Sequence, residues 1–245
     1  MKINVIVNGA KGRMGQVTVN AIKNEPTLTL VSQANKGDNL NQLIKETHAQ
    51  VVVDFTPASV AYENAKKIIE AGAHPVIGSS GITAEQVKTL QMLCAEKKLG
   101  GVIAPNFSIG ATLMMQFAKL ASKYLPHVEI IELHHDQKVD APSGTAIKTA
   151  EMIAEIKTQI QPKVKETEIL KGARGANYHD IKIHSIRLPG LFSHQEVIFG
   201  NLGETLTLRL DAIDRQAMMP GVILACKKVI TLNTLYYGLE HLLSF

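Results

Sequence analysis

One stretch near the start of the chain decides the fold: Lys2-Ile3-Asn4-Val5-Ile6-Val7-Asn8-Gly9-Ala10-Lys11-Gly12-Arg13-Met14-Gly15. It joins an apolar run typical of a buried strand to a G-x-x-G-x-x-G turn, and an amphipathic helix pattern follows. This order is typical of a dinucleotide-binding βαβ unit. We expect Gly9 to make the turn, Gly12 to admit a pyrophosphate and Gly15 to let the helix approach the strand, with Arg13 near a phosphate. A plain glycine turn is the alternative.

The alternation of strand and helix continues through roughly the first 105 residues. Further strands are predicted at 28–33, 51–56, 75–77 and 101–104, with helices at 40–46 and 84–97. We also expect Thr56 to cap a helix that has Pro57 at its first position. These repeats predict an α/β fold with a doubly wound parallel (Rossmann-like) sheet. Ligands bind at the carboxyl ends of such strands, so the turns at 78–81 and 105–108 should face a cofactor.

The pattern changes after about residue 109. A helix at 111–123 and a strand at 128–133 come first, and strand-like runs then follow at 180–188, 195–199 and 205–211. Strands with no helices between them indicate a mixed sheet in a second, α+β domain. The helical segment Arg215 to Ile230 should pack back on the first domain. We therefore predict a dinucleotide-binding domain, 1–106 with 214–245, and a substrate-binding domain, 107–213.

A polar stretch, Glu132 through Ala146 (ELHHDQKVDAPSGTA), runs directly into an amphipathic helix pattern. The start of a helix offers unpaired N–H groups and a partial positive charge. Ser143, Gly144 and Thr145 therefore form a candidate cradle for a carboxylate or phosphate.

Three side chains just before this helix carry titratable groups. Lys138 is a mobile cation that can bind an anion or donate a proton, and His134 and His135 titrate near neutral pH. Each alone is compatible with an ordinary polar loop, but such crowding at a helix start favours a ligand site. We expect no metal, because adjacent histidines at a strand end point in opposite directions and the cysteines are remote.

The composition limits the partners. The 26 Lys+Arg against 22 Asp+Glu give a formal charge of +4, too small and dispersed to predict a nucleic-acid partner. Cys94 and Cys226 are isolated in predicted helices and are expected to be reduced core residues. Without a signal-peptide pattern or an apolar run of 18 residues, we expect a cytoplasmic protein that does not enter the membrane.

Over essentially its whole length the chain resembles the bacterial dihydrodipicolinate reductases, also called 4-hydroxy-tetrahydrodipicolinate reductases. The family's signature stands here as Glu132, His135, Lys138, Asp140 and Pro142 through Ala146. Supporting matches are Gly9 to Gly15, Asp54-Phe55-Thr56, Ala104-Pro105-Asn106-Phe107, Gly175, Arg187 and Gly203-Glu204-Thr205. Two positions depart from the family: Gly78-Ser79-Ser80-Gly81 replaces Gly-Thr-Thr-Gly, and Asn35 stands where an acid is common.

The resemblance implies an enzyme of lysine and diaminopimelate biosynthesis that uses NADPH or NADH to reduce a cyclic dicarboxylate to tetrahydrodipicolinate. It makes His134 the proton donor or acceptor and Lys138 a proton donor, while His135, Gly144 and Thr145 bind substrate. Cofactor contacts fall on Gly9, Ala10, Lys11, Gly12, Arg13, Met14, Gly78, Ser79, Ser80, Ala104, Pro105, Asn106 and Phe107. It also implies a homotetramer formed through the sheet of the second domain.

The residues after the second strand bear on the choice of nicotinamide cofactor. An acid about 20 residues beyond the glycine turn normally binds the ribose 2′-OH of NADH. Here that position is Asn35, which carries no charge, and Lys36 beside it offers a cation to the 2′-phosphate of NADPH. We therefore predict that NADPH is used at least as well as NADH. Asp38 is the alternative acid if the loop is longer.

Two other functions are compatible with these residues. One is a different two-domain NAD(P)-dependent dehydrogenase, acting on an amino acid or a semialdehyde, which a substrate screen would separate. The other is a dinucleotide sensor without catalysis, which measurable oxidation of NAD(P)H would exclude.

Overall fold

The computed structural model describes residues 2–156 and 167–243. The chain divides into two compact units: unit 1 is Met1–Ile109 with Arg215–Phe245, and unit 2 is Gly110–Asp214. The functions that the sequence predicts for these two parts stay predictions. Within the described ranges, no helix is both long and apolar enough to cross a membrane.

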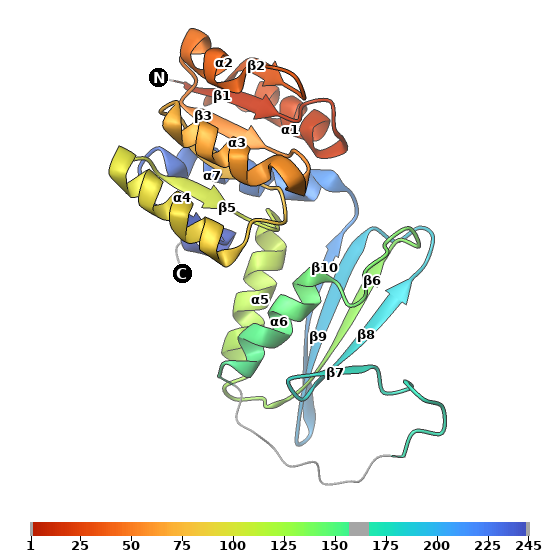
Figure 1. The fold of residues 1–245 in the computed structure, drawn as a ribbon. Helices are drawn as coiled ribbons and strands as arrows, with labels where there is room; N and C mark the ends of the chain where they lie inside the picture. Colours follow the sequence, from red (N-terminus) through yellow and green to blue (C-terminus); the bar gives the residue numbers. More distant parts are fainter. Residues whose placement is uncertain (1, 157–166, 244–245) are drawn as a thin grey trace. The chain divides into compact units, whose positions relative to one another are not determined.

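Unit 1 is built on a six-stranded parallel sheet in the order β11-β5-β4-β3-β1-β2 (Figure 1). Its elements are β1 (Ile3–Asn8), α1 (Arg13–Asn24), β2 (Leu28–Ala34), α2 (Leu40–Thr47), β3 (Val51–Asp54), α3 (Ala58–Glu70), β4 (His74–Ile77), α4 (Ala84–Lys97), β5 (Gly101–Ile103), the 3-10 helix η1 (Arg215–Met218), α7 (Met219–Val229), β11 (Leu235–Tyr237) and the 3-10 helix η2 (Leu239–Leu242). The predicted doubly wound sheet is confirmed.

Both faces of this sheet are buried, which explains its apolar strands. Val5 and Val53 belong to one hydrophobic core, formed with α1 and α7. Ile6 and Val52 belong to a second core, formed with α2, α3 and α4. Because successive residues of a strand point to opposite faces, an unbroken apolar strand feeds both cores. The expected packing of Arg215 to Ile230 on the first domain is also confirmed, since Val222, Ala225 and Val229 lie in the first of these cores.

The sheet has a switch point at β1, which lies between β2 and β3. From β1 the chain moves outward to β2 and then returns to the other side as β3. The turns that follow β1 and β3 therefore diverge and leave a crevice at the carboxyl ends of these strands. This is the place where such sheets bind ligands.

Two local predictions in unit 1 need correction. Thr56 does not cap a helix: its hydroxyl donates to Asp54 Oδ1 at 2.6 Å, and Pro57 itself is the N-cap of α3. The predicted helix from Arg215 to Ile230 is two elements, η1 and then α7. Proline lacks an N–H and fits the first turn of a helix, so Pro220 marks a new start rather than a continuation.

Unit 2 contains a five-stranded sheet in the order β10-β9-β6-β8-β7. Its elements are α5 (Ile109–Ala121), β6 (His127–His134), α6 (Gly144–Ala154), β7 (Ala176–Tyr178), β8 (Ile181–Arg187), β9 (Ser193–Asn201) and β10 (Glu204–Ala212). Strands β6 and β8 are parallel and the other pairs are antiparallel, so the predicted mixed sheet is confirmed. Helices α5 and α6 pack on it through a third core that includes Ala118, Ile130, Ala150 and Phe199.

The register of β6 with its two neighbours determines which side chains lie beside His134. His134, the last residue of β6, lies opposite Arg187 in β8 and opposite Ser193 in β9. Side chains from three strands therefore meet at the carboxyl end of β6.

Candidate active site

The glycine turn after β1 is built by close backbone contacts. Gly9 has a φ of +79°, and its carbonyl accepts a hydrogen bond from Gly12 N at 2.9 Å. Helix α1 begins at Arg13. A Cβ on Gly15 would lie 2.1 Å from Gly9 O, far inside contact distance. The first turn of α1 therefore reaches the end of β1 only because Gly15 lacks a side chain.

A pocket of about 330 Å³ opens at the switch point. It brings together five residues predicted to bind cofactor: Arg13, Met14, Gly78, Ser79 and Ser80. Its wall is completed by Phe55, Thr56, Pro57 and Ala58, which the sequence analysis did not assign to the site. These four follow the carboxyl end of β3. The rule that ligands bind at the carboxyl ends of parallel strands, applied to this turn as it was to the others, would have predicted them.

Asp54 joins the turns around this pocket. Its buried carboxylate accepts hydrogen bonds from Asn8 Nδ2 (2.7 Å), Thr56 N (2.9 Å), Thr56 Oγ1 (2.6 Å), Asn64 Nδ2 (3.1 Å) and Ser79 Oγ (3.1 Å). The donors come from the ends of β1, β3 and β4 and from α3. One carboxylate thus fixes two side chains of the pocket wall, Thr56 and Ser79.

The predicted turn after β5 lies behind the pocket wall. Phe107 is buried, and its ring meets that of Phe55 edge to face with centroids 6.0 Å apart. Asn106 Oδ1 accepts a hydrogen bond from Ser108 N at 2.8 Å. Of the other predicted cofactor residues, Ala10 and Ala104 are buried, while Lys11, Gly12 and Pro105 are exposed.

Asn35, just after β2, is fixed against the glycine turn. Its Oδ1 accepts a hydrogen bond from Lys11 N at 2.9 Å, so its NH₂ group is left to present donors. Asp38 bends back within the same loop, because Asp38 Oδ2 accepts from Asn35 N at 2.8 Å. Lys36 is exposed.

In unit 2, the polar stretch forms the loop between β6 and α6. Ser143 is the N-cap of α6, and its hydroxyl accepts a hydrogen bond from Ala146 N at 3.2 Å. Apart from the neighbouring residues and the backbone of α6 itself, a Cβ added to the next residue, Gly144, would meet no atom of residues 2–156 and 167–243 within 4 Å. Thr145 is half-buried in the same turn. The predicted anion cradle is therefore a capped helix start with open space in front of Gly144.

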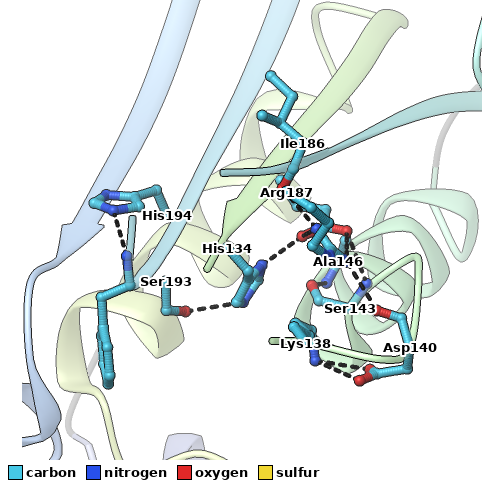
Figure 2. Close-up of polar contacts among 11 residues, drawn as sticks. His134, Lys138, Asp140, Ser143, Ala146, Ile186, Arg187, Ser193 and His194 are labelled. Atoms are coloured by element: carbon cyan, nitrogen blue, oxygen red, sulfur yellow. Dashed lines mark hydrogen bonds and ion pairs between the residues drawn. The ribbon is translucent and has the colours of Figure 1, made fainter. Parts of the chain in front are cut away.

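Lys138 is the cation of this loop (Figure 2). Its Nζ donates to Asp140 Oδ1 and Oδ2 at 2.7 and 2.8 Å. This hydrogen bond, with the charges of Lys138 and Arg187, lowers the pKa of Asp140 against a smaller effect of burial. The Asp140 side chain is 64% exposed, and exposed ion pairs stabilise by only about 0–1 kcal/mol. Lys138 can exchange this partner for a ligand at low cost.

The two histidines have different surroundings. His135 is half-buried, with its ring centroid 6.5 Å from that of Phe192. His134 is held at both ring nitrogens: Nδ1 lies 2.5 Å from Glu132 Oε2 and Nε2 lies 3.1 Å from Ser193 Oγ (Figure 2). Only 13% of the His134 side chain is exposed.

Glu132 is a fully buried carboxylate at the centre of this cluster. Arg187 donates to both of its oxygens, at 2.7 and 2.9 Å, and Ser143 N donates to Oε1 at 3.3 Å. Burial alone would raise the pKa of Glu132. The hydrogen bonds from His134, Arg187 and Ser185 and the charge of Arg187 outweigh burial and lower this pKa to about 2. Glu132 is therefore ionised at neutral pH.

The sequence analysis gave no role to Glu132, Arg187 or Ser193. A signal existed for Glu132, because residues two apart on a strand share a face and His134 is two residues later. Arg187 and Ser193 carried no such signal, since only the pairing of β8 and β9 with β6 brings them to His134.

The comparisons with known proteins cover both units. Residues 3–107 match the family model described as dihydrodipicolinate reductase, N-terminus, and residues 110–243 match dihydrodipicolinate reductase, C-terminus. The 4-hydroxy-tetrahydrodipicolinate reductase of Legionella pneumophila subsp. pneumophila is 54% identical over 243 residues, 99% of this chain and 100% of that protein. The protein of the same name from Coxiella burnetii is 54% identical over 244 residues, with the same coverage.

A solved structure, the dipicolinate-bound dihydrodipicolinate reductase from Paenisporosarcina sp. TG-14, superimposes with a TM-score of 0.93. It is 42% identical, and the match covers 99% of this chain and 100% of that one. Three findings agree on the family. The two family models together span both units, the relatives exceed 50% identity over the full length, and the solved structure matches the whole chain. The chain belongs to the dihydrodipicolinate reductase family.

Proposed function

We propose that this chain catalyses the NAD(P)H-dependent reduction of 4-hydroxy-tetrahydrodipicolinate to tetrahydrodipicolinate, a step of lysine and diaminopimelate biosynthesis. The relatives carry the name of this activity over their full length. The observation that carries the proposal is the loop between β6 and α6. It places His134 and Lys138 beside a helix start in a chain whose other unit has a dinucleotide-type glycine turn.

The loop suits a dicarboxylate substrate. The partial positive charge at the start of α6 attracts a carboxylate, and the open space at Gly144 lets that carboxylate approach the backbone. In this proposal Ser143, Gly144 and Thr145 bind one end of the substrate, and His135 adds a further contact. Lys138, released from Asp140, supplies a full positive charge.

The same loop holds groups that can deliver a proton. When bound, NADPH or NADH supplies the hydride. Reduction also requires a proton, so an acid must stand within reach of the substrate. In this proposal Lys138 donates a proton from Nζ, and His134 gives or takes one at Nε2. Burial of the His134 ring limits its exchange with bulk water.

The residues of unit 1 fit a dinucleotide. The pocket at the switch point has the volume of a small-ligand site, and the start of α1 with Arg13 offers positive charge to a pyrophosphate. In this proposal Gly9 to Met14 and Gly78 to Ser80 contact the cofactor, and Ala104 to Phe107 support the pocket wall from behind.

The proposal is tested by following the loss of NAD(P)H absorbance with substrate generated in place from aspartate semialdehyde and pyruvate. We expect oxidation only when both precursors and the enzyme that condenses them are present. Oxidation with a different amino acid or semialdehyde alone would favour another dehydrogenase. Cofactor binding without turnover on any of these substrates would favour a dinucleotide sensor.

Gly144→Ala tests the anion cradle. No protein atom lies within 4 Å of the added methyl group, and alanine is the better helix former, so the unfolding temperature should not fall. The methyl group occupies the proposed path of the carboxylate, so we expect KM for the dicarboxylate to rise about tenfold, roughly 1.4 kcal/mol of lost binding. Steady-state kinetics and thermal unfolding on the same preparation measure both effects.

Gly200→Ala is the matched control, since its added Cβ also meets no protein atom within 4 Å, and Gly200 lies in β9 outside the loop. It should leave KM unchanged. An unchanged KM in Gly144→Ala would remove Gly144 from the binding site.

The choice of cofactor gives a further prediction. Asn35 presents donors and no negative charge, Asp38 is held within its own loop, and Lys36 is an exposed cation. We expect NADPH to be used at least as well as NADH. Lys36→Ala should weaken NADPH selectively by about 1 kcal/mol, roughly fivefold, as for an exposed charge contact. The ratio of kcat/KM for the two cofactors, at fixed substrate and ionic strength, is the measurement.

Lys23→Ala, an exposed lysine in the last turn of α1, serves as the control and should leave this ratio unchanged. A preference of the unmodified enzyme for NADH of more than about tenfold, some 1.4 kcal/mol, would show that an acid such as Asp38 binds the ribose.

We also propose that the enzyme works in the cytoplasm as a homotetramer. Both cysteines are free, buried thiols, which suits a reducing compartment. The outer strand of the second sheet, β10, is largely exposed, and so is Leu202 just before it. Light scattering on the purified protein measures the mass, and a monomer at micromolar concentration would contradict the tetramer.

A further inference from the structure

His134 has a single fixed orientation within unit 2. Glu132 meets its Nδ1 and Ser193 meets its Nε2, so the ring is held at opposite sides by β6 and β9. Figure 2 shows the ring between these two contacts. A ring that is hydrogen-bonded at both nitrogens cannot flip without breaking two hydrogen bonds.

Glu132 also determines which nitrogen carries the proton. An ionised carboxylate can only accept hydrogen bonds, so the Nδ1 that faces it must carry an N–H. In the neutral ring Nε2 is then the acceptor, and Ser193 Oγ–H donates to it. A proton that His134 gains or gives up therefore resides at Nε2, the nitrogen on the far side from Glu132.

Glu132 is itself held in place by two elements, β8 and the start of α6. Arg187 of β8 binds both carboxylate oxygens and also donates to the carbonyl of Asp140 at 2.8 Å. Ser143 N, at the start of α6, donates to Oε1. The same carboxylate thus links the ring of His134 to the loop that carries Lys138 and to the proposed anion cradle.

From this geometry we infer that Glu132 is a positioning residue for His134: it fixes the tautomer and the orientation of the ring, and Arg187 and Ser143 N hold Glu132 in turn. The inference rests on the proposed function, because the tautomer of His134 affects turnover only if Nε2 takes part in proton transfer. Glu132 itself stays ionised and is fully buried, so in this inference it acts on the substrate only through His134.

Glu132→Gln is the first test. Arg187 Nη2 and Ser143 N can only donate toward Oε1, so the amide oxygen of the variant should take that position. Its NH₂ group then takes the place of Oε2, where Arg187 Nη1 loses its acceptor and Nδ1 of His134 must accept, so the ring proton moves to Nε2. We expect kcat to fall at least tenfold, since a positioned acid–base group contributes about 10²–10⁴, while KM for the dicarboxylate changes little.

Glu129→Gln is the matched control. Glu129 lies on the same strand, three residues earlier and so on the other face, and it binds an arginine and a histidine in the same way, Arg174 and His184. This variant should keep kcat. It separates the loss of a carboxylate in β6 that binds an arginine and a histidine from the loss of the carboxylate that holds His134.

A double variant shows whether Glu132 acts through His134. If it does, Glu132→Gln combined with His134→Ala should be no slower than His134→Ala alone. A purely structural role for Glu132 predicts instead that the two losses multiply. Multiplied losses, or an unchanged kcat in Glu132→Gln, would overturn the inference.

Nitrogen-15 NMR of the unsubstituted protein gives a readout that does not need turnover. The resonances of His134 are identified by their absence in His134→Ala, and at a pH where the ring is neutral they should report a proton on Nδ1. A proton on Nε2 would overturn the inference. If the NMR result is as expected but no NAD(P)H is oxidised, the proposed function has failed and the positioning of His134 stands.

Discussion

Lys138→Ala is expected to lower kcat by about a hundredfold or more, the range for a lost general acid. The side chain belongs to the one lysine or arginine of the loop between Glu132 and Ala146, and its Nζ donates to both oxygens of Asp140. Alanine removes both the proton donor and the charge that attracts a carboxylate. Steady-state kinetics with saturating NADPH and varied dicarboxylate separates the effect on kcat from the effect on KM.

Lys119→Ala is the control for this experiment. Lys119 lies in α5 and pairs with Glu155 at 2.5 Å, so the variant also removes a lysine ion pair from unit 2. It should turn over at the rate of the unmodified enzyme. A Lys138→Ala enzyme with near-normal kcat would exclude Lys138 as the acid.

Gly15→Ala is expected to disable cofactor binding and to weaken the fold. Its Cβ would lie 2.1 Å from Gly9 O and 2.8 Å from Ala10 Cα, both backbone atoms, so α1 must move away from the end of β1. Overpacking of this kind costs about 1–3 kcal/mol. At the upper end this lowers the unfolding temperature by roughly 6–12 °C for a chain of this size. Because α1 begins at the pocket, we also expect Kd for NADPH to rise at least tenfold, about 1.4 kcal/mol.

Gly12→Ala separates the loss of stability from the loss of cofactor binding. A Cβ there would lie 3.2 Å from Gly9 O, a contact that a small shift can relieve, so stability should fall far less than in Gly15→Ala. Thermal unfolding without ligand and titration with NADPH are measured on both variants. Equal unfolding temperatures for Gly15→Ala and the unmodified protein would show that α1 does not need this close approach.

The architecture of unit 1 was predictable because its signals are local. The apolar run Val51–Val53 predicts a strand that is covered on both faces, and the glycine turn after β1 predicts a helix packed close behind it. Each of these two patterns spans only a few residues. Strands β7 and β11 were missed because each is three residues long and, unlike β5, is not fully buried, so neither stands out as an apolar run.

The candidate site, too, was predicted only where its signals are local. The loop that carries His134, Lys138 and Ser143 was found because its chemistry is contiguous in the sequence. Arg187 and Ser193 reach His134 through strand pairing across more than fifty residues, and no local pattern encodes that register. Asp54 was placed inside a strand predicted to run to Thr56, and its role was missed because its five donors are gathered by three strand ends and a helix.

The division of unit 1 into two segments of the chain has a consequence for the order of folding during synthesis. One face of its parallel sheet is covered by α7, through Val222, Ala225, Cys226 and Val229, and β5 gains its outer neighbour only from β11. Those parts leave the ribosome after all of unit 2, which is a single continuous segment. The nascent first segment therefore has this face covered by α1 alone while unit 2 completes its own sheet. A fragment that stops at Ile109 would keep the part that α7 covers exposed to water, so the core behind the glycine turn is completed by residues more than a hundred positions away in the chain.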